Sequence, residues 1–341
     1  MRPTGSTMKR LPSHPARTQP GGTNMKRYLC TPLRMITLTL GLALLLGTSG
    51  HAGEVMHFEL AGEPLIQYQA APLENARGGK RFSGSNFIHP LKTPSGFSVT
   101  HSQPLDHWHH FGLWWPWKYV KQGERQVLFW ELQRQQGIIE ATGAVRTADG
   151  FTAESVYIDR NADGGPQEWI REEVHATISD LVDAPAHGYH LDLAITQHVL
   201  GDAPLEIVRY RYSGFTLRGA QKWNRGNSSV LTSEGLDYAH SQGTRARWIL
   251  VQGANDSGGT SGILMMSHPK NQNHPEHLRT WDPSTLNGAI FVNFNPVQEA
   301  SFMIEPDTPH TRKYRVFVFD GDLSAHCAES LWDDYLSVAS L

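Results

Sequence analysis

Histidines are the residue type in this sequence best suited to chemistry, and 18 of the 341 residues are histidine. Four of them fall between residues 101 and 117, where His107, His109 and His110 follow Asp106 directly. Because side chains alternate along an extended segment, we expect His107 and His109 on one side and His110 on the other. A neutral imidazole can exchange a proton near pH 7 or bind a metal ion. The cluster therefore predicts a functional site, the alternative being a buried polar network that only holds loops together.

Two other segments supply groups for the same site. His268 and His274 lie in a proline-containing window that predicts a loop, which would either contact a ligand or be only a rigid surface loop. Glu234 lies at a polar break between predicted strands, where its carboxylate would reach a cleft or occupy a surface turn. We expect Glu234 to act as base and His107 or His109 as acid, with the two windows meeting in space.

Tryptophans next to the first histidine cluster indicate the ligand class. Trp114, Trp115 and Trp117 follow His110 closely, and a buried indole N–H needs a hydrogen-bond partner. An apolar platform with a few polar groups is a typical way to bind a sugar ring. We therefore expect these tryptophans, with Asp106, His110, His268 and His274, to contact an oligosaccharide or a small-molecule ligand. At least two of the tryptophans near the cluster are expected to fill the core instead.

The charge is distributed unevenly along the chain. Residues 1–52 contain seven of the 30 Lys and Arg and none of the 33 Asp and Glu, so the remainder has 23 basic and 33 acidic residues and a net charge of −10. An acidic body is a poor partner for nucleic acid, whose phosphates are bound by Lys and Arg. By the same reasoning its overall field favours a neutral or cationic ligand over a polyanion, unless local arginines or a metal ion reverse it.

The basic N-terminal segment is typical of an export signal. Positive residues precede the uncharged, Leu-rich run 35–47, and small residues follow up to Ala52. The run is shorter than the ~20 apolar residues that span a bilayer, so it predicts a cleavable signal peptide rather than an anchor. Residues 1–52 are thus expected to be an N-terminal extension plus signal peptide. The mature protein would be periplasmic or secreted and not held in a membrane.

The remaining residues, 53–341, are expected to form a single β-rich domain. Large apolar residues alternate with others in 189–195, as in a half-buried strand. Further strands are predicted at 127–132, 151–158, 169–178, 207–217, 246–251, 262–266, 289–294 and 313–319. Apolar residues at helical spacing after Ser324 predict one helix over 324–340. The fold class is therefore all-β, a large antiparallel β-sandwich or supersandwich with one C-terminal helix.

The segment D-H-W-H-H-F-G-L-W at 106–114 resembles the D-H-P-H-H-x-G-L-W signature of a bacterial family usually labelled PmoA-like. Segments around 209–215, 231–235, 245–248 and 268–275 resemble its later blocks in the same order, so the resemblance covers most of 85–320. Trp108 stands where the family has Pro, and Phe111 where it has Arg. Without that Arg, any scheme in which it binds an anionic substrate is weakened.

The resemblance implies an exported protein associated with carbohydrate metabolism. It also implies an all-β fold similar to the galactose-mutarotase-like supersandwich of many sugar epimerases, lyases and hydrolases. It supplies motif positions but no catalytic roles. The family label suggests methane monooxygenase, but that subunit spans the membrane several times, whereas this chain has one short apolar run.

Taken together, the sequence predicts an exported carbohydrate-active protein. The favoured hypothesis is an enzyme that hydrolyses, eliminates or epimerises a sugar or glycoside by acid–base chemistry and requires no cofactor. A non-catalytic glycan-binding protein would share the tryptophan platform but need no acid–base pair. A third hypothesis is a divalent metal ion held by His107, His109 and His274.

Overall fold

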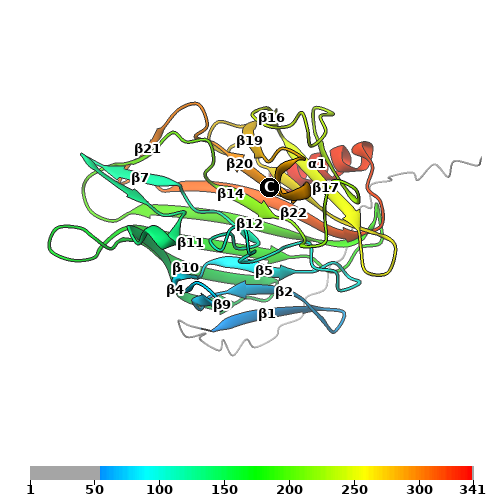
Figure 1. Ribbon diagram of the computed structural model, residues 1–341, viewed down its shortest axis with the longest axis horizontal. Coiled ribbons are helices and arrows are strands. Elements are labelled where there is room, and N and C mark those ends of the chain that lie inside the picture. The colour runs from blue at the N-terminus through cyan, green and yellow to red at the C-terminus, as the bar shows by residue number, and fades with distance from the viewer. Residues whose placement is uncertain (1–53, 340–341) are drawn as a thin grey trace, which may run out of the picture.

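Two antiparallel sheets of eight strands each make up most of the computed structural model, which describes residues 54–339 (Figure 1). The predicted signal peptide and the last two residues lie outside the described residues. A four-stranded and a two-stranded sheet complete the strands. The predicted all-β sandwich with one C-terminal helix is confirmed.

The first sheet carries the segments that later form the candidate site. Its strands, in spatial order, are β1 (Val55–Leu60), β2 (Glu63–Gln69), β5 (Phe87–Leu91), β6 (Leu113–Trp114), β14 (Phe215–Arg218), β20 (Phe291–Asn295), β19 (Glu276–Thr280) and β16 (Arg245–Ala246). Strands far apart in sequence, such as β6 and β14, are therefore neighbours.

The second sheet is built from longer strands. In spatial order they are β15 (Ser228–Thr232), β17 (Trp248–Ala254), β18 (Thr260–Ser267), β22 (His310–Asp320), β12 (His187–Val199), β11 (Gln167–Ile178), β10 (Gly150–Asp159) and β9 (Gly137–Arg146). The four-stranded sheet has the order β21 (Phe302–Ile304), β13 (Leu205–Ile207), β7 (Tyr119–Gln122) and β8 (Arg125–Leu128). The smallest sheet pairs β3 (Leu73–Asn75) with β4 (Gly79–Gly84), and short 3-10 turns lie at Leu132–Arg134 and Thr285–Asn287.

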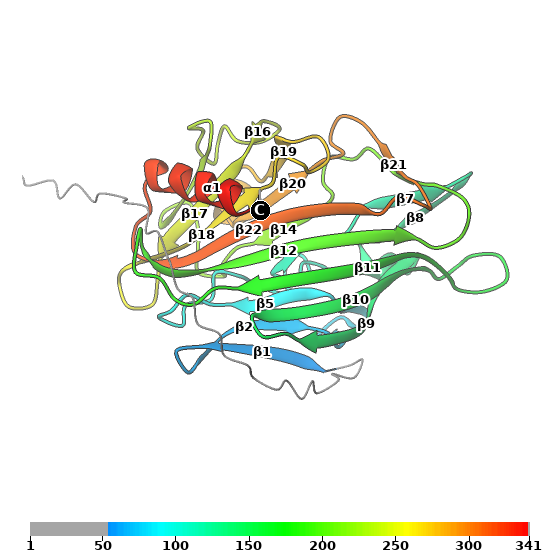
Figure 2. The same cartoon turned by 180° about the vertical axis from the view of Figure 1, so that it is seen from behind.

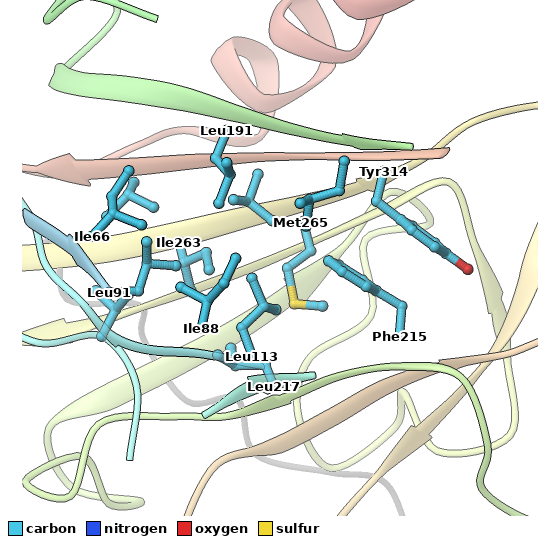
Figure 3. Packing of buried hydrophobic residues seen from close by; sticks show 14 of the residues in the cluster. Ile66, Ile88, Leu91, Leu113, Leu191, Phe215, Leu217, Ile263, Met265 and Tyr314 are labelled. Atoms are coloured by element: carbon cyan, nitrogen blue, oxygen red, sulfur yellow. The ribbon is translucent and has the colours of Figure 1, made fainter. Parts of the chain in front are cut away.

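The main core fills the space between the two large sheets. Figure 3 shows Leu113 and Leu217 from the first sheet pointing toward Leu191 and Met265 from the second, and all four are buried. In β12 the odd positions from Tyr189 to Ile195 are buried and the even ones partly exposed, as the alternation predicts.

The helix α1 (Ala325–Ala339) covers the outer face of the second sheet (Figure 2). Its start agrees with the prediction, because the backbone N–H of Cys327 donates to the Ser324 hydroxyl at 3.2 Å, as in a capped helix. Leu331 and Trp332 pack with residues of β17, β18 and β22. Within the described residues, no helix is both long and apolar enough to cross a membrane.

Glu329 fastens this helix to the sheet. Its carboxylate accepts the indole N–H of buried Trp248 at 2.7 Å and pairs with Arg247, whose guanidinium lies 4.7 Å from the Trp332 ring. Glu329→Ala is expected to lower the free energy of unfolding by about 1–3 kcal/mol, because a buried donor loses its acceptor. Urea denaturation measures this, with exposed Asp333→Ala as the control. An equal loss of unfolding free energy in Glu329→Ala and Asp333→Ala would contradict this role of Glu329.

Two predicted strands end earlier than expected. The segment 127–132 is strand only to Leu128, and 207–217 is split into β13 and β14 by the irregular segment 208–214. Both breaks supply side chains to one cavity.

Candidate functional site

A cavity of about 880 Å³ lies on the outer face of the first sheet, away from the main core. Its floor includes Phe291 of β20, while the next residue, Val292, points into the core. The walls come from four irregular segments, at 107–110, 130–134, 210–212 and 238–242, and from the end of β19. The cavity therefore collects residues from distant parts of the sequence.

The first histidine cluster lines this cavity. The ring of His107 lies 5.5 Å from that of His109 and 4.6 Å from that of His110. His107 Nδ1 is 2.9 Å from Asp106, which in turn accepts two hydrogen bonds from Arg218 at 2.8 and 3.0 Å. Asp106 thus contacts His107 directly, and the three imidazoles lie together.

Burial decides the charge of two of these imidazoles, His109 and His110. It lowers the pKa of His109 to about 4, and the nearby His107 opposes the effect of Glu131 on that pKa. Burial also lowers the pKa of His110 well below its ordinary value, and no partner for His110 Nδ1 lies among the described residues. His109 and His110 are therefore neutral at pH 7, so His109 is suited to accept a proton or to hydrogen-bond a hydroxyl.

Gly112 shows why the chain turns as it does after the histidines. Its φ is +71°, and a Cβ there would lie 2.7 Å from the carbonyl oxygen of Ile88. Only glycine fits such a conformation at such a close approach. The turn brings Trp114 into β6, where its ring lies 5.2 Å from that of His110.

A second cluster in the same cavity joins Lys118, Glu131 and Tyr212. The Tyr212 hydroxyl donates to Glu131 Oε1 at 2.5 Å, and Lys118 Nζ donates to Tyr212 at 3.0 Å and pairs with Glu131 Oε2. The side chains of Lys118 and Glu131 are only 4% and 16% exposed. The Lys118 ammonium also lies 4.9–5.1 Å from the ring centroids of Tyr119, Tyr210 and Tyr212.

Burial and neighbouring charges shift the pKa values of Lys118 and Tyr212 in this cluster. Burial lowers the pKa of Lys118, although its bond to Glu131 works in the opposite direction. Burial and then the bond to Glu131 raise the pKa of Tyr212, so this hydroxyl stays protonated. The Glu131 carboxylate therefore lies between a cation and a neutral hydrogen-bond donor on the wall of the cavity.

The predicted tryptophan platform is divided by the strand geometry. Trp114 is buried beneath His110, whereas Trp115 and Trp117 point into the core. Their indole N–H groups donate to Glu172 at 2.8 Å and to Gln197 at 2.7 Å. The cavity surface is instead formed by other rings, among them Trp130, Tyr210 and Trp281.

Glu234 lies elsewhere. It follows β15 on an exposed turn, its side chain is 54% exposed, and its nearest cation is Arg247 at 3.9 Å. Arg247 belongs to the contact that fastens α1. Glu234 does not line the cavity, so the structure does not bring it together with His107 and His109.

The second histidine window packs against α1. The rings of His268 and His274 lie 5.6 Å from Tyr335 and 6.5 Å from Trp332. The window precedes β19 at Glu276, whereas Trp281, just after the other end of β19, lines the cavity. Five residues of strand separate the two ends by about 17 Å. His268 and His274 are therefore not part of the cavity wall.

Sequence reasoning missed several cavity residues. Lys118 ends the tryptophan run, Glu131 follows Trp130, and Tyr212 lies in a segment predicted as strand. The available signal was a pair of polar interruptions: Glu131 inside the predicted strand 127–132, and Arg209 and Arg211 inside the predicted strand 207–217.

A second cavity, of about 680 Å³, lies on the other side of the loop that carries the histidines. Asp106, Trp108 and Arg218 line it, whereas His107 and His109 face the first cavity. Within residues 54–339, no three His, Cys, Asp or Glu side chains are placed to share a metal ion.

The fold and the cavity define an all-β sandwich protein with a polar, aromatic-lined pocket on one sheet. Residues 56–333 match a family of unknown function, DUF6807, and since the match covers most of the chain, the protein belongs to that family. None of the curated proteins matches the sequence.

Proposed function

We propose that the protein is an exported enzyme that acts on a sugar or glycoside by acid–base chemistry in the 880 Å³ cavity. The observation that carries the proposal is the shared exposure of the Glu131 carboxylate and the His107 and His109 imidazoles to one cavity with aromatic walls. The volume suits one or a few sugar rings. The all-β sandwich, the architecture that the PmoA-like resemblance implies, supports the same reading.

In this proposal Glu131 is the base, in place of Glu234. Lys118 stabilises its charge and Tyr212 orients it, since both contact the carboxylate directly. Neutral His109 holds a substrate hydroxyl, and His107, paired with Asp106, is the acid that donates a proton as Glu131 accepts one. No step requires a cofactor. A general base contributes about 10²–10⁴-fold to a rate.

The test compares three carboxylates. Purified protein is assayed on nitrophenyl glycosides that include uronides, and on free sugars by NMR for epimerisation. Glu131→Gln is expected to lower kcat/KM at least ~100-fold in protein that still folds. Because Lys118 loses its counter-charge, Tm is expected to fall as well, so all variants are assayed below the Tm of Glu131→Gln. Exposed Glu305→Gln is the matched control and should behave as wild type.

Three results would overturn the proposal. Full activity of Glu131→Gln would remove the base, and loss of activity in Glu234→Gln alone would favour the sequence-based assignment. Retention of oligosaccharides without turnover of any substrate, unaffected by Glu131→Gln, would identify a glycan-binding protein instead.

A further inference from the structure

Four cationic side chains line the cavity that contains Glu131, namely Lys118, Arg134, Arg211 and Arg279. The lining also contains two carboxylates, Glu131 and Asp282. Asp282 is exposed and already accepts two hydrogen bonds from Ser284. Since the buried histidines are neutral, the cavity has an excess of positive charge. This local field is opposite in sign to that of the acidic body.

The arginines of the cavity lack anionic partners. Within residues 54–339, exposed Arg134, exposed Arg211 and half-buried Arg279 form no ion pair with a carboxylate. Arg279 donates through Nη1 to Gln242 at 2.9 Å, and its Nε is buried without a partner among the described residues.

The cations are also close enough to influence each other. The Arg211 guanidinium lies 5.7 Å from the Tyr212 ring, which also faces Lys118 at 4.9 Å. Burial and then Arg211 lower the pKa of Arg279. Gathering like charges beside an unpaired buried donor is unfavourable unless an anion offsets it. Guanidinium groups bind carboxylate and sulfate oxygens in a two-point geometry.

We propose that the cavity binds an anionic saccharide, with Arg211 and Arg279 contacting its acidic group and the aromatic wall contacting its ring. The saccharide part of this inference rests on the proposed function, whereas the anionic part rests only on the charges that line the cavity. Phe111 replaces an arginine of the PmoA-like motif, but an acidic ligand can still bind because other segments supply positive charge to the cavity.

Isothermal titration with glucuronate, galacturonate, glucose and glucose 6-sulfate tests the proposal, with inorganic sulfate as an arm for the anion without a sugar. At least one acidic sugar is expected to bind at least ~10-fold more tightly than glucose, and added NaCl should weaken it. Arg211→Gln and Arg279→Gln should each remove most of this preference. Arg209→Gln is the control, because Arg209 is exposed in the same segment and bonds the Gln298 carbonyl at 3.2 Å.

Equal affinity for neutral and acidic sugars would overturn the inference, as would sulfate binding as tightly as the acidic sugars. Arginine-dependent binding of an acidic sugar without turnover would support it while the enzymatic proposal fails. Turnover of neutral glycosides that neither arginine variant changes would support the enzymatic proposal and overturn the inference of an anionic saccharide.

Discussion

Glu172→Ala is expected to lower the free energy of unfolding by about 3–5 kcal/mol, because it leaves a buried cation without its counter-charge. Glu172 is fully buried between the sheets and lies 3.5 Å from Arg312, which is equally buried. Its carboxylate accepts hydrogen bonds from Asn86 and Trp115, both at 2.8 Å, and from Gln197 at 2.6 Å. Urea denaturation measures the loss.

Two further variants separate the ion pair from general damage to the core. The double variant Glu172→Leu/Arg312→Leu should cost less than the sum of the two single changes, because it removes the unpaired charge. Glu173→Ala changes the half-exposed neighbour of Glu172 and is expected to cost less than about 1 kcal/mol. Strict additivity in the double variant, or a Glu172→Ala loss no larger than that of Glu173→Ala, would contradict the prediction.

This network connects the core to the candidate site. Trp115 and Trp117 are held from inside by Glu172 and Gln197, and Lys118 follows them directly on the cavity side. Residues that the sequence indicated as a sugar platform therefore position the lysine that contacts Glu131.

The sheets could be predicted because their signal is local. Alternation in residues 189–195 requires only that one side of a strand be buried, and the burial of β12 follows it. The interruption at 208–214 could not be predicted from apolar content, since Tyr210 and Tyr212 fit a strand pattern as well as a cavity wall. The start of the helix at Ser324 was predictable, because its cap is a contact between neighbours in sequence.

The site could be predicted only where its residues are adjacent. The three histidines of the local cluster line one cavity, and Asp106 contacts His107 from the side of the second cavity. Glu131 and Glu234 could not be ranked from the sequence, since each is a carboxylate in a polar interruption, one inside a predicted strand and one between predicted strands. Which of them meets the histidines depends on strand order, because β6 lies between β5 and β14 in the first sheet, and no local pattern encodes that order.

Acidification is expected to destabilise the protein well before its carboxylates are neutralised. Burial is the largest cause that lowers the pKa of His89, His109, His190 and His274 to about 4 and that of His310 to about 3. In the unfolded chain each would titrate near ~6.5. Between these values the unfolded state binds protons that the native state excludes, so stability is complete above pH ~6.5 and falls as pH decreases toward ~4.

The size of this effect follows from the number of excluded protons, since each one contributes up to about 1.4 kcal/mol per pH unit. Tm measured by calorimetry from pH ~7.5 to ~4.5 should therefore decline steeply in the lower half of the range. His310→Gln removes one such proton and should make the decline shallower, whereas exposed His57→Gln should not. A flat Tm down to pH ~5, or an identical slope in both variants, would show that the imidazoles are solvated in the native state. It would also remove the reason for treating His109 as a neutral group in the cavity.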